Sequence, residues 1–318
     1  MTQSTKQATL EGVIVSAYGK RFDVELTKPP TQELSADTAA AQKNRISCVT
    51  RGKKTDVACG DTVTIKLTDN HEGVIETIHP RKTLLYRSNA FKSKMLAANV
   101  SQIVIVLATQ PSFYEALLNR CLIAAEAANI KALIVLNKCD LPDSVGAREK
   151  LNLYKSLGYS FVGISAITDI AGLMQHLEGH ASILVGQSGM GKSTMINALL
   201  PNAAVRTQEV SQVLDSGKHT TTAAHLYHLN ATSQLIDSPG LQEFGLHHLS
   251  IEALEHAFIE FRPFLGHCRF NNCQHTHEPD CAIMNAEKSG AISAIRLNTY
   301  QLLRDEINAS HAILNPGG

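Results

Sequence analysis

The sequence feature that most constrains the fold is a glycine-rich run in the middle of the chain. It reads Gly186-Gln-Ser-Gly-Met-Gly-Lys-Ser193 and fits the pattern GxxxxGK[ST]. An apolar run, SILV, precedes it and a helical stretch, TMINALL, follows it, which is the strand–loop–helix context that the motif requires. Glycines in such a loop let successive backbone N–H groups surround phosphate oxygens. The run predicts a phosphate loop, and a chance glycine-rich turn is the alternative.

Each residue type in this run has a chemical reason to be there. The lysine brings positive charge near the β- and γ-phosphates, and the Ser193 hydroxyl can ligate Mg²⁺. The start of the following helix adds the positive end of its dipole. The residues predicted to bind phosphate are Gly186, Gln187, Ser188, Gly189, Met190, Gly191, Lys192, Ser193 and Thr194.

Two motifs upstream of this loop predict contacts with a purine base. Asn137-Lys138-Cys139-Asp140 directly follows the apolar run ALIVL and fits the NKxD pattern of GTPases. A carboxylate acceptor at Asp140 suits guanine, because its N1–H and N2–H₂ groups both donate. Ser165-Ala166 follows the run FVGI and is similar to the short element that closes over the guanine. A charged turn at a strand end is the alternative for the first motif, and only its position supports the second.

Two motifs downstream predict contacts with Mg²⁺ and the terminal phosphate. Asp237-Ser-Pro-Gly240 follows the run SQLI and fits DxxG, in which the Asp holds Mg²⁺ through water and the Gly N–H meets the γ-phosphate; a plain β-turn is the alternative. Gly217–Thr222 lies where a switch loop supplies a threonine to Mg²⁺. We choose Thr221 for this ligand, Thr220 and Thr222 stay open, and a polar turn is the other interpretation.

These motifs stand in an order that differs from that of ordinary GTPases, in which the phosphate loop comes first and NKxD late. Here Asn137 and Ser165 precede Gly186, and Asp237 follows it. The domain is therefore circularly permuted, and the same site can form because the motifs sit at strand ends. The chain that leaves Asp237 leads directly into the C-terminal region, so we expect the nucleotide state to move residues 245–318.

The regions that flank the motifs have different patterns. Residues 1 to about 85 hold short β-rich runs such as VIVSAYGKRFDVEL and CGDTVTIKL, which predict a small all-β barrel. From about residue 90, continuous apolar runs such as QIVIVLA alternate with helical patterns, which is typical of an α/β domain. Beyond Gly245, helices are predicted over Ile251–Leu265 and Glu287–Ala309. We expect one side of the second helix to carry Ile292, Ile295, Leu302 and Leu303.

The C-terminal region also holds a cluster of metal-ligand residues. Three thiols and one imidazole stand within fourteen residues: Cys268, Cys273, His275 and Cys281. Cys₃His is a closed tetrahedral zinc set, so we expect a structural ion whose binding energy becomes folding energy. Separate free thiols or a disulfide are the alternatives, and a reducing compartment disfavours the disulfide. His267 and His277 are further candidate ligands.

With these motifs in view, the chain resembles the RsgA (YjeQ) family of circularly permuted, small-ribosomal-subunit-dependent GTPases. The resemblance covers the barrel region, the permuted motif order, the GKHTTT loop and the Cys/His tail. It implies an OB-like barrel over 1–88, a permuted P-loop GTPase domain over 89–245 and a mostly helical zinc domain over 246–318. It also implies that His275 is the zinc ligand and that the protein acts late in 30S assembly.

The residue that would act on the attacking water is not at its usual place. In many small GTPases a glutamine follows DxxG and orients the water, whereas Leu241 stands there and Gln242 comes one residue later. His219 is the candidate, because a well-placed imidazole can position or deprotonate water, and the resemblance implies the same residue. A purely conformational role for His219 is the alternative.

Charge and hydropathy limit the partners. The longest apolar runs are far shorter than the ~20 residues of a membrane helix, and the first residues lack the apolar core of a signal peptide. The net charge is zero, but residues 1–92 hold 14 basic and 10 acidic residues, and the rest hold 15 and 19. We therefore expect modest non-specific binding of nucleic acid and recognition of a folded RNA surface by shape. Candidate RNA contacts are Arg45, Arg51, Lys53 and Lys54.

The sequence thus predicts a GTPase coupled to the 30S subunit and its 16S rRNA, with one structural Zn²⁺ and with Mg²⁺ bound alongside GTP. We expect a cytoplasmic monomer without a membrane partner. A GTP-gated RNA-binding assembly factor, whose slow hydrolysis only resets binding, is the main alternative. A permuted GTPase for the large subunit is disfavoured by the barrel and the Cys₃His set, and a P-loop kinase or ATPase is disfavoured by NKCD.

Overall fold

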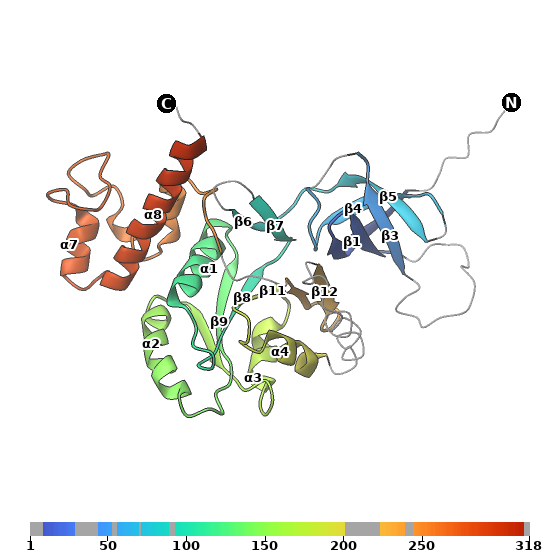
Figure 1. The fold of residues 1–318 in the computed structure, drawn as a ribbon, viewed down its shortest axis with the longest axis horizontal. Coiled ribbons are helices and arrows are strands. Elements are labelled where there is room, and N and C mark those ends of the chain that lie inside the picture. Colours follow the sequence, from blue (N-terminus) through green and yellow to red (C-terminus); the bar gives the residue numbers. More distant parts are fainter. Residues whose placement is uncertain are drawn as a thin grey trace.

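The computed structural model describes residues 9–28, 44–52, 56–69, 71–88, 93–200, 223–238 and 244–314. An N-terminal barrel and a C-terminal group of helices lie at opposite ends of the molecule, and an α/β sheet lies between them (Figure 1). The multidomain architecture that the sequence predicts is therefore confirmed. Among the described residues, no helix is both long and apolar enough to span a membrane.

The barrel is built from five short strands. They are β1 (Thr9–Tyr18), β2 (Arg21–Leu26), β3 (Arg45–Thr50), β4 (Thr62–Leu67) and β5 (Glu72–Ile78). The order is β1-β2-β3-β5-β4, and β4 also pairs with β1, which closes the barrel. Alternate residues such as Ile14, Val24 and Ile65 are fully buried inside, as expected for strands with one face on a core. This order agrees with the predicted OB-like barrel.

The central sheet has the alternating strand and helix pattern that the sequence predicts. Its strands are β8 (Gln102–Leu107), β9 (Lys131–Leu136), β10 (Ser160–Gly163), β11 (Ala181–Val185), β12 (Ala224–His228) and β13 (Gln234–Asp237). They lie in the order β10-β9-β8-β11-β13-β12; β10, β9, β8, β11 and β13 run parallel to one another, and only β12 is antiparallel. All six residues of β8 are buried, which explains its continuous apolar run.

Helices cover both faces of this sheet. They are α1 (Glu115–Ala127), α2 (Ser144–Ser156), α3 (Ala171–Leu177) and α4 (Lys192–Leu199). Residues of α1 and α2 share a core cluster with one face of β8 and β9, and residues of α3 and α4 share a second cluster with the other face. The barrel continues into the same sheet, because Ser16 and Ala17 of β1 pair with His225 and Ala224 of β12.

A separate two-stranded hairpin lies between the barrel and the C-terminal helices (Figure 1). It consists of β6 (Leu84–Ser88) and β7 (Ser93–Ala98). Ser88 at the end of β6 forms a β-bridge with Leu246. The predicted domain limits at residues 88 and 245 therefore meet in space at this bridge, and the exact division into domains stays a prediction.

The C-terminal region is helical, but its helices differ from the predicted ranges. The observed elements are α6 (Ile251–Ala257), a 3₁₀ turn η2 (Arg262–Phe264), α7 (Ala282–Lys288) and α8 (Ala294–Leu314). The helix predicted to reach Leu265 ends at Ala257, where Phe258 leaves the helix and contacts the Tyr300 ring edge-on. Helix α7 stops before Gly290, whose φ of 80° is left-handed, so the predicted start at Glu287 is wrong.

The buried side of α8 also differs from the prediction. Ile292 and Leu303 are buried, whereas Ile295 is 49% and Leu302 66% exposed. The inner stripe instead carries Arg296, which is wholly buried and donates to Asn119 Oδ1 of α1 at 2.6 Å. The same guanidinium pairs with Glu260, with 3.2 Å between Nη2 and Oε2. The C-terminal helices thus share a core with α1, and a nucleotide-driven movement of residues 245–318 stays a prediction.

Candidate functional site

Four of the predicted motifs follow the carboxyl ends of neighbouring parallel strands. Asn137 follows β9, Ser165 follows β10, Gly186 follows β11, and Asp237 ends β13. Because carboxyl ends of parallel strands share one edge of the sheet, these residues gather there although their order in the chain is permuted. This edge is the candidate nucleotide site.

The glycine-rich run forms a compact loop that leads into α4. Gly186 has a φ of 152°, and a Cβ there would lie 2.4 Å from the carbonyl oxygen of Val106. Gly191 has a φ of 90°, and its Cβ would lie 2.3 Å from Nδ2 of Asn137. Met190 is fully buried and anchors the loop to the core. Only glycine fits both positions, so the backbone can curve tightly, as phosphate binding requires.

The polar side chains of this loop face different surroundings. Ser188, Ser193 and Thr194 are exposed, and Gln187 is half-buried. The side chain of Gln187 accepts a hydrogen bond from the backbone N–H of Tyr114 at 2.8 Å, which holds the loop against the residues that follow β8. The exposed hydroxyl groups are therefore open to a ligand.

Lys192 and Asp237 bring opposite charges to this edge. The Lys192 ammonium donates to the carbonyl oxygens of Gly186 at 2.6 Å and Gln187 at 2.7 Å. The pKa of Lys192 is lowered, because burial outweighs the opposing charge of Asp237. The pKa of Asp237 is raised, because burial outweighs the opposing charge of Lys192. The carboxylate of Asp237 and the hydroxyl of Ser193 are the hard oxygen donors that Mg²⁺ prefers, so the residues fit the predicted ion.

Asn137 joins two of the motifs. Its side-chain Nδ2 donates to the carbonyl oxygen of Met190 at 2.9 Å, and its Oδ1 accepts from the backbone N–H of Ala166 at 2.9 Å. The side chain is buried, with 2% of its surface exposed. One amide group therefore fixes the phosphate loop and the Ser165-Ala166 element relative to each other.

The other residues of NKxD lie around the same loop. Lys138 has a left-handed φ of 60° and donates from its ammonium to the carbonyl oxygens of Gly189, at 2.9 Å, and Gln110. Asp140 is exposed at the edge, where its carboxylate can accept hydrogen bonds from a ligand. Ser165 pairs with Asp169 in an isolated bridge that shapes the neighbouring turn. His219, Thr221 and Gly240 lie outside the described residues.

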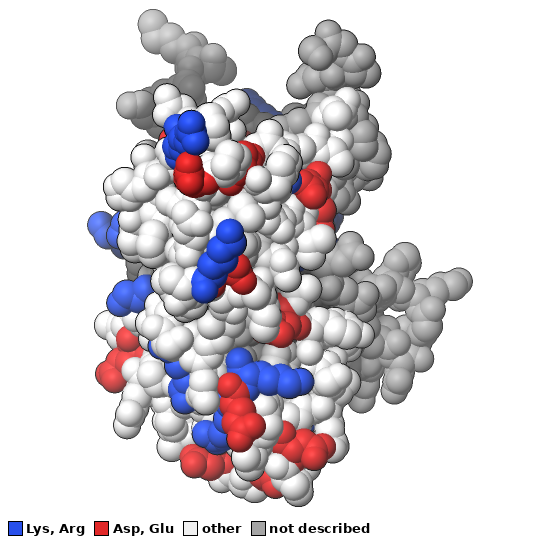
Figure 2. All heavy atoms as spheres, turned by 90° about the vertical axis from the view of Figure 1, so that its left-hand side faces the viewer, with Lys and Arg blue, Asp and Glu red and all other residues white. Residues whose placement is uncertain are grey.

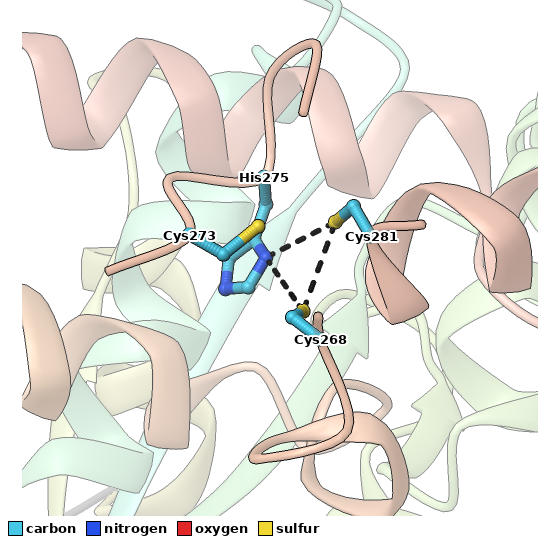
Figure 3. A group of neighbouring side chains, drawn as sticks. All are labelled: Cys268, Cys273, His275 and Cys281. Carbon is cyan, nitrogen blue, oxygen red and sulfur yellow. Dashed lines mark hydrogen bonds between the residues drawn. The ribbon is translucent and has the colours of Figure 1, made fainter. Parts of the chain in front are cut away.

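The four predicted metal ligands come together in the C-terminal region (Figure 3). The ligand atoms of Cys268, Cys273, His275 and Cys281 all lie within 4.8 Å of one another. The Nδ1 atom of His275 is 3.6 Å from Sγ of Cys268 and 3.3 Å from Sγ of Cys281, and those two sulfurs are 3.9 Å apart. A tetrahedron with zinc bond lengths has edges of about 3.5–3.8 Å, so the donor set and its spacing fit zinc. The other candidates, His267 and His277, are exposed and outside this group.

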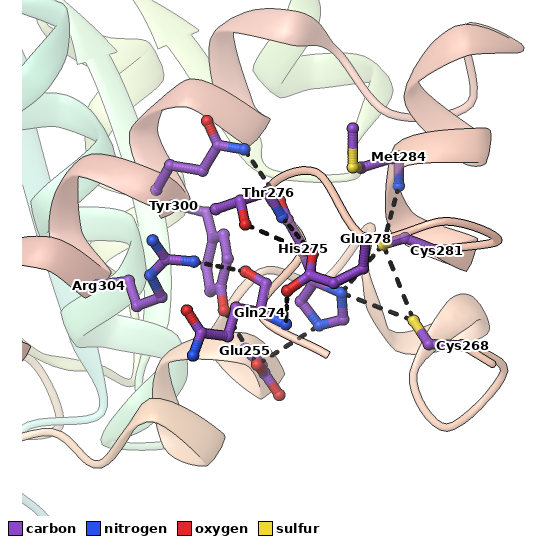
Figure 4. Close-up of polar contacts among 11 residues, drawn as sticks. Glu255, Cys268, Gln274, His275, Thr276, Glu278, Cys281, Met284, Tyr300 and Arg304 are labelled. Carbon is purple, nitrogen blue, oxygen red and sulfur yellow. Dashed lines mark hydrogen bonds and ion pairs between the residues drawn. The ribbon is translucent and has the colours of Figure 1, made fainter. Parts of the chain in front are cut away.

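Residues outside the predicted ligand set hold His275 in place (Figure 4). The carboxylate of Glu255 lies 3.4 Å from Nε2 of His275 and accepts from the Tyr300 hydroxyl at 3.0 Å. This contact on Nε2 leaves Nδ1 facing the sulfurs, which is the arrangement of a carboxylate–histidine–metal site. The side chain of Gln301 donates to the carbonyl oxygen of His275 at 2.9 Å. No sequence pattern points to Glu255, because it lies on helix α6, twenty residues before His275 in the chain.

The loop between the ligands has its own support. Glu278 accepts hydrogen bonds from the backbone N–H groups of Gln274 at 2.8 Å and Thr276 at 2.9 Å. Burial raises the pKa of Glu278, but these N–H groups outweigh it and bring the pKa to about 2. Arg304 of α8 donates to the carbonyl oxygen of Gln274 at 2.6 Å. The loop is thus held at its turn by Glu278 and at its base by α8.

Comparison with known proteins agrees with this arrangement. The family model for the RsgA GTPase matches residues 78–247. A protein of Nitrosospira multiformis named small ribosomal subunit biogenesis GTPase RsgA is 48% identical over 309 residues, which cover 96% of this chain and 94% of that protein. The chain belongs to the RsgA GTPase family. An RsgA protein with the same name from Neisseria meningitidis is 49% identical over 92% of this chain and 91% of its own length.

Solved structures support the same fold. The crystal structure of YjeQ from Thermotoga maritima has a TM-score of 0.69 and 27% sequence identity, and covers 94% of this chain and 99% of its own. That of YloQ, described as a circularly permuted GTPase, has a TM-score of 0.64 and 26% identity over 97% and 98% of the two chains. The predicted permuted GTPase fold and the predicted GTP hydrolase activity of this RsgA family member are confirmed.

Proposed function

We propose that this RsgA family member couples GTP hydrolysis to the small ribosomal subunit and acts in its late maturation. The observation that carries the nucleotide part is the double hydrogen bond of Asn137, which sets the phosphate loop against Ala166 with Asp140 exposed beside them. The relatives' name, small ribosomal subunit biogenesis GTPase, supports the subunit as partner.

In this proposal, each strand-end motif has one task. The phosphate loop from Gly186 to Thr194 surrounds the phosphates, and Asp140 accepts the guanine N1–H and N2–H₂ groups. Ser193 and Thr221 would ligate Mg²⁺, Asp237 would hold the ion through water, and the backbone N–H of Gly240 would contact the γ-phosphate. His219 orients the attacking water, because Leu241 replaces the usual glutamine.

The zinc ion has a structural task in this proposal. Bound by Cys268, Cys273, His275 and Cys281, it would link the loop to α7 and supply folding energy to it. Cys281 is the N-cap of α7, where its sulfur accepts from the backbone N–H of Met284 at 3.5 Å. The metal loop thereby orders one end of the C-terminal surface.

Contacts with 16S rRNA would depend on shape more than on bulk charge. Of the four candidate contacts in the barrel, Arg45 pairs with Glu25 at 3.3 Å and Arg51 with Glu76 at 3.2 Å, and Lys53 and Lys54 lie outside the described residues. On the face that carries the C-terminal helices, basic and acidic side chains are interspersed (Figure 2). Mixed charge favours a folded RNA surface over free RNA. We propose that the protein works on the subunit as a cytoplasmic monomer.

Steady-state hydrolysis of GTP and of ATP, each with and without small and large subunits, tests this function. We expect strong stimulation of GTP hydrolysis by small subunits alone, and little hydrolysis of ATP. Tight GTP-dependent binding to small subunits without stimulation would instead support the alternative, a GTP-gated assembly factor whose hydrolysis only resets binding. Equal stimulation by large subunits would contradict the proposed partner.

A further inference from the structure

The segment that follows β8 lies against one side of the phosphate loop. A Cβ on Gly189 would lie 3.0 Å from Cδ of Pro111, so these two residues are in close contact. The ammonium of Lys138 donates to the carbonyl oxygens of both Gly189 and Gln110, which joins the same two stretches of chain. Because the N–H groups of a phosphate loop must converge on one point, the shape of this loop depends on where residues 109–114 lie.

The phosphate loop also caps the helix into which this segment leads. Tyr114 is the N-cap of α1, and its backbone N–H donates to Oε1 of Gln187 at 2.8 Å. In a capping box, a Glu or Gln at the third helical position accepts this hydrogen bond, but Leu117 stands there. Gln187 supplies the acceptor instead, from a distant part of the chain. The start of α1 and the phosphate loop are therefore joined directly.

Buried side chains fix the first turns of α1 to α2. The carboxylate of Glu115 accepts from the Tyr154 hydroxyl of α2 at 2.8 Å. The side chain of Asn119 donates to the same hydroxyl oxygen at 3.0 Å and to the carbonyl oxygen of Glu115 at 3.0 Å. Asn119 is 1% exposed and Tyr154 is wholly buried. Burial and the Glu115 carboxylate raise the pKa of Tyr154, so the hydroxyl keeps the proton that it donates.

Arg296 of α8 completes this network from the C-terminal region. Its Nη1 donates to Oδ1 of Asn119 at 2.6 Å, so both N–H groups and the oxygen of the Asn119 amide have partners. The guanidinium is wholly buried, pairs with Glu260, and lies 4.5 Å from the centre of the Phe258 ring. All these residues lie outside the metal loop from Cys268 to Cys281. The network thus joins α8 to α1 independently of the metal ligands.

Stability alone gives little reason for a buried guanidinium at this contact. Removal of a charged pair from water costs free energy, and well-packed apolar residues in its place are often equally stable or more so. What a fully hydrogen-bonded network adds is one defined arrangement of the helices that it joins. Apolar packing between α1 and α8 would allow small shifts of α1, which the hydrogen bonds of Asn119 oppose.

We propose that Arg296 is a positioning residue for nucleotide binding. Through Asn119 it fixes the start of α1, and it thereby holds residues 109–114 against the phosphate loop. The inference rests on the proposed nucleotide site at the sheet edge. Arg296 acts only through the network, so its loss should change the affinity for nucleotide and not merely the stability of the fold.

The first experiment measures the affinity for a fluorescent GDP analogue. Arg296→Met keeps an unbranched apolar side chain and removes the hydrogen bond to Asn119. We expect binding to weaken by about 2-fold to 30-fold, the range of a residue that couples two sites. Arg120→Met is the matched control, because the Arg120–Glu306 ion pair also joins α1 to α8 but lies outside the network. This control should bind the analogue as the wild type does, and equal losses in both variants would overturn the proposal.

Arg296→Met leaves Glu260 buried without its partner, so a milder variant tests the same connection. Tyr154→Phe removes one hydroxyl and leaves the ring in place, and it should weaken binding by about 2-fold or more. The control is Tyr159→Phe, which removes a buried hydroxyl that has no hydrogen-bond partner among the residues that the structure describes. Melting curves by circular dichroism show which variants fold. Wild-type affinity in folded Tyr154→Phe would overturn the proposal, because the network would then only stabilise the fold.

A double-mutant cycle tests the route from Arg296 to the phosphate loop. Gln187→Ala removes the hydrogen bond with Tyr114, so the later loss of Arg296 should matter less. We expect Q187A/R296M to bind the analogue less weakly than the product of the two single effects predicts, since residues that act through one connection are not additive. Effects that multiply would show that the two residues act independently, and would overturn the route.

Lys192→Ala separates this inference from the proposed nucleotide site. If Lys192→Ala binds the analogue as tightly as the wild type does, the proposed site is wrong. If Lys192→Ala loses binding while folded Arg296→Met and Tyr154→Phe keep it, only the positioning role of Arg296 is wrong.

Discussion

The metal loop and the nucleotide edge hold their ligands by opposite means. The four metal ligands come from one stretch of fourteen residues, and their side chains turn inward toward one point. The nucleotide edge draws on residues from 137 to 237 that four parallel strands of one sheet bring together. In the proposed zinc site the ion would take the place of a core, whereas the sheet itself positions the residues of the nucleotide edge. This contrast teaches that ligand removal should matter for folding in one region and only for activity in the other.

Removal of the metal should give the largest effect and tests this contrast directly. A chelator should unfold the loop from Cys268 to Cys281, since structural zinc contributes up to about 10–16 kcal/mol in small domains. The thiols should then react with a thiol reagent, and circular dichroism should show less helix. Nucleotide affinity should change little. Thiols that stay unreactive after chelation would contradict the comparison.

Asn137→Ala should act in the other region alone. It removes the two buried hydrogen bonds that the Asn137 side chain makes, one to Met190 and one to Ala166, and each lost bond leaves a buried group unsatisfied at a cost of about 1–3 kcal/mol. We expect GTP affinity, measured by titration calorimetry, to fall by roughly 30-fold or more, with unchanged zinc content. Asn298→Ala, an exposed residue on α8, is the matched control. Normal GTP affinity in Asn137→Ala would show that the edge is held together otherwise.

Glu255→Gln tests whether the carboxylate beside His275 supports metal binding. Loss of the carboxylate beside Nε2 of His275 should weaken zinc binding by about 10–100-fold, measured by competition with a chelating dye. Glu252→Gln on the same helix is exposed and should bind zinc as the wild type does. Equal affinities would mean that the four ligands alone orient the imidazole.

The smallest effect is expected where the barrel meets the central sheet. His228 pairs with Glu25 at 2.8 Å; the hydrogen bond with Glu25 raises the pKa of His228, and the same bond lowers the pKa of Glu25. The contribution of His228 to the free energy of unfolding is fully present below its usual pKa of 6.5. It is lost as the pH rises through the raised pKa. The contribution of Glu25 is full above 4.5 and is lost as pH falls through the lowered value.

This pair should therefore stabilise the fold most between pH 4.5 and 6.5, by roughly 0.2–1 kcal/mol because it is half-exposed. Denaturant unfolding of His228→Gln at several pH values should show a stability deficit that shrinks above the raised pKa. His71→Gln, an exposed histidine, serves as the control. A deficit that is the same at every pH would assign the effect to packing.

The positions of the motifs at strand ends could be predicted from the sequence, because that information is local, whereas their contacts with nucleotide stay a prediction. Each motif follows an apolar run. Because the carboxyl ends of parallel strands share one edge of the sheet, the motifs come together there. The clustering of Cys268, Cys273, His275 and Cys281 was predictable for the same reason, since one loop supplies all four side chains. His219, Thr221 and Gly240 stay predictions.

The parts that sequence reasoning missed depend on contacts between distant segments. Helix α6 ends early because Phe258 packs against Tyr300, more than forty residues away. The inner stripe of α8 was misplaced because it contains Arg296, a charged residue that is buried only through its pairing with Glu260 and Asn119. Periodicity scores such a residue as exposed. The hydrogen bond from the backbone N–H of His248 to the Ser88 hydroxyl could not be predicted for the same reason, because it joins residues far apart in the sequence.

The central claim is that guanine is read at the sheet edge by Asp140, and one measurement tests it most directly. Asp140→Asn replaces a carboxylate acceptor by an amide that can donate to a carbonyl at the purine C2 position, as in xanthine. We compare the affinities of wild type and variant for GTP, XTP and ATP by competition against a labelled nucleotide. The account predicts that the variant loses GTP affinity by roughly 100-fold or more, given about 3 kcal/mol for paired hydrogen bonds to a charged group, and gains affinity for XTP. Unchanged GTP affinity, with no gain for XTP, would contradict it.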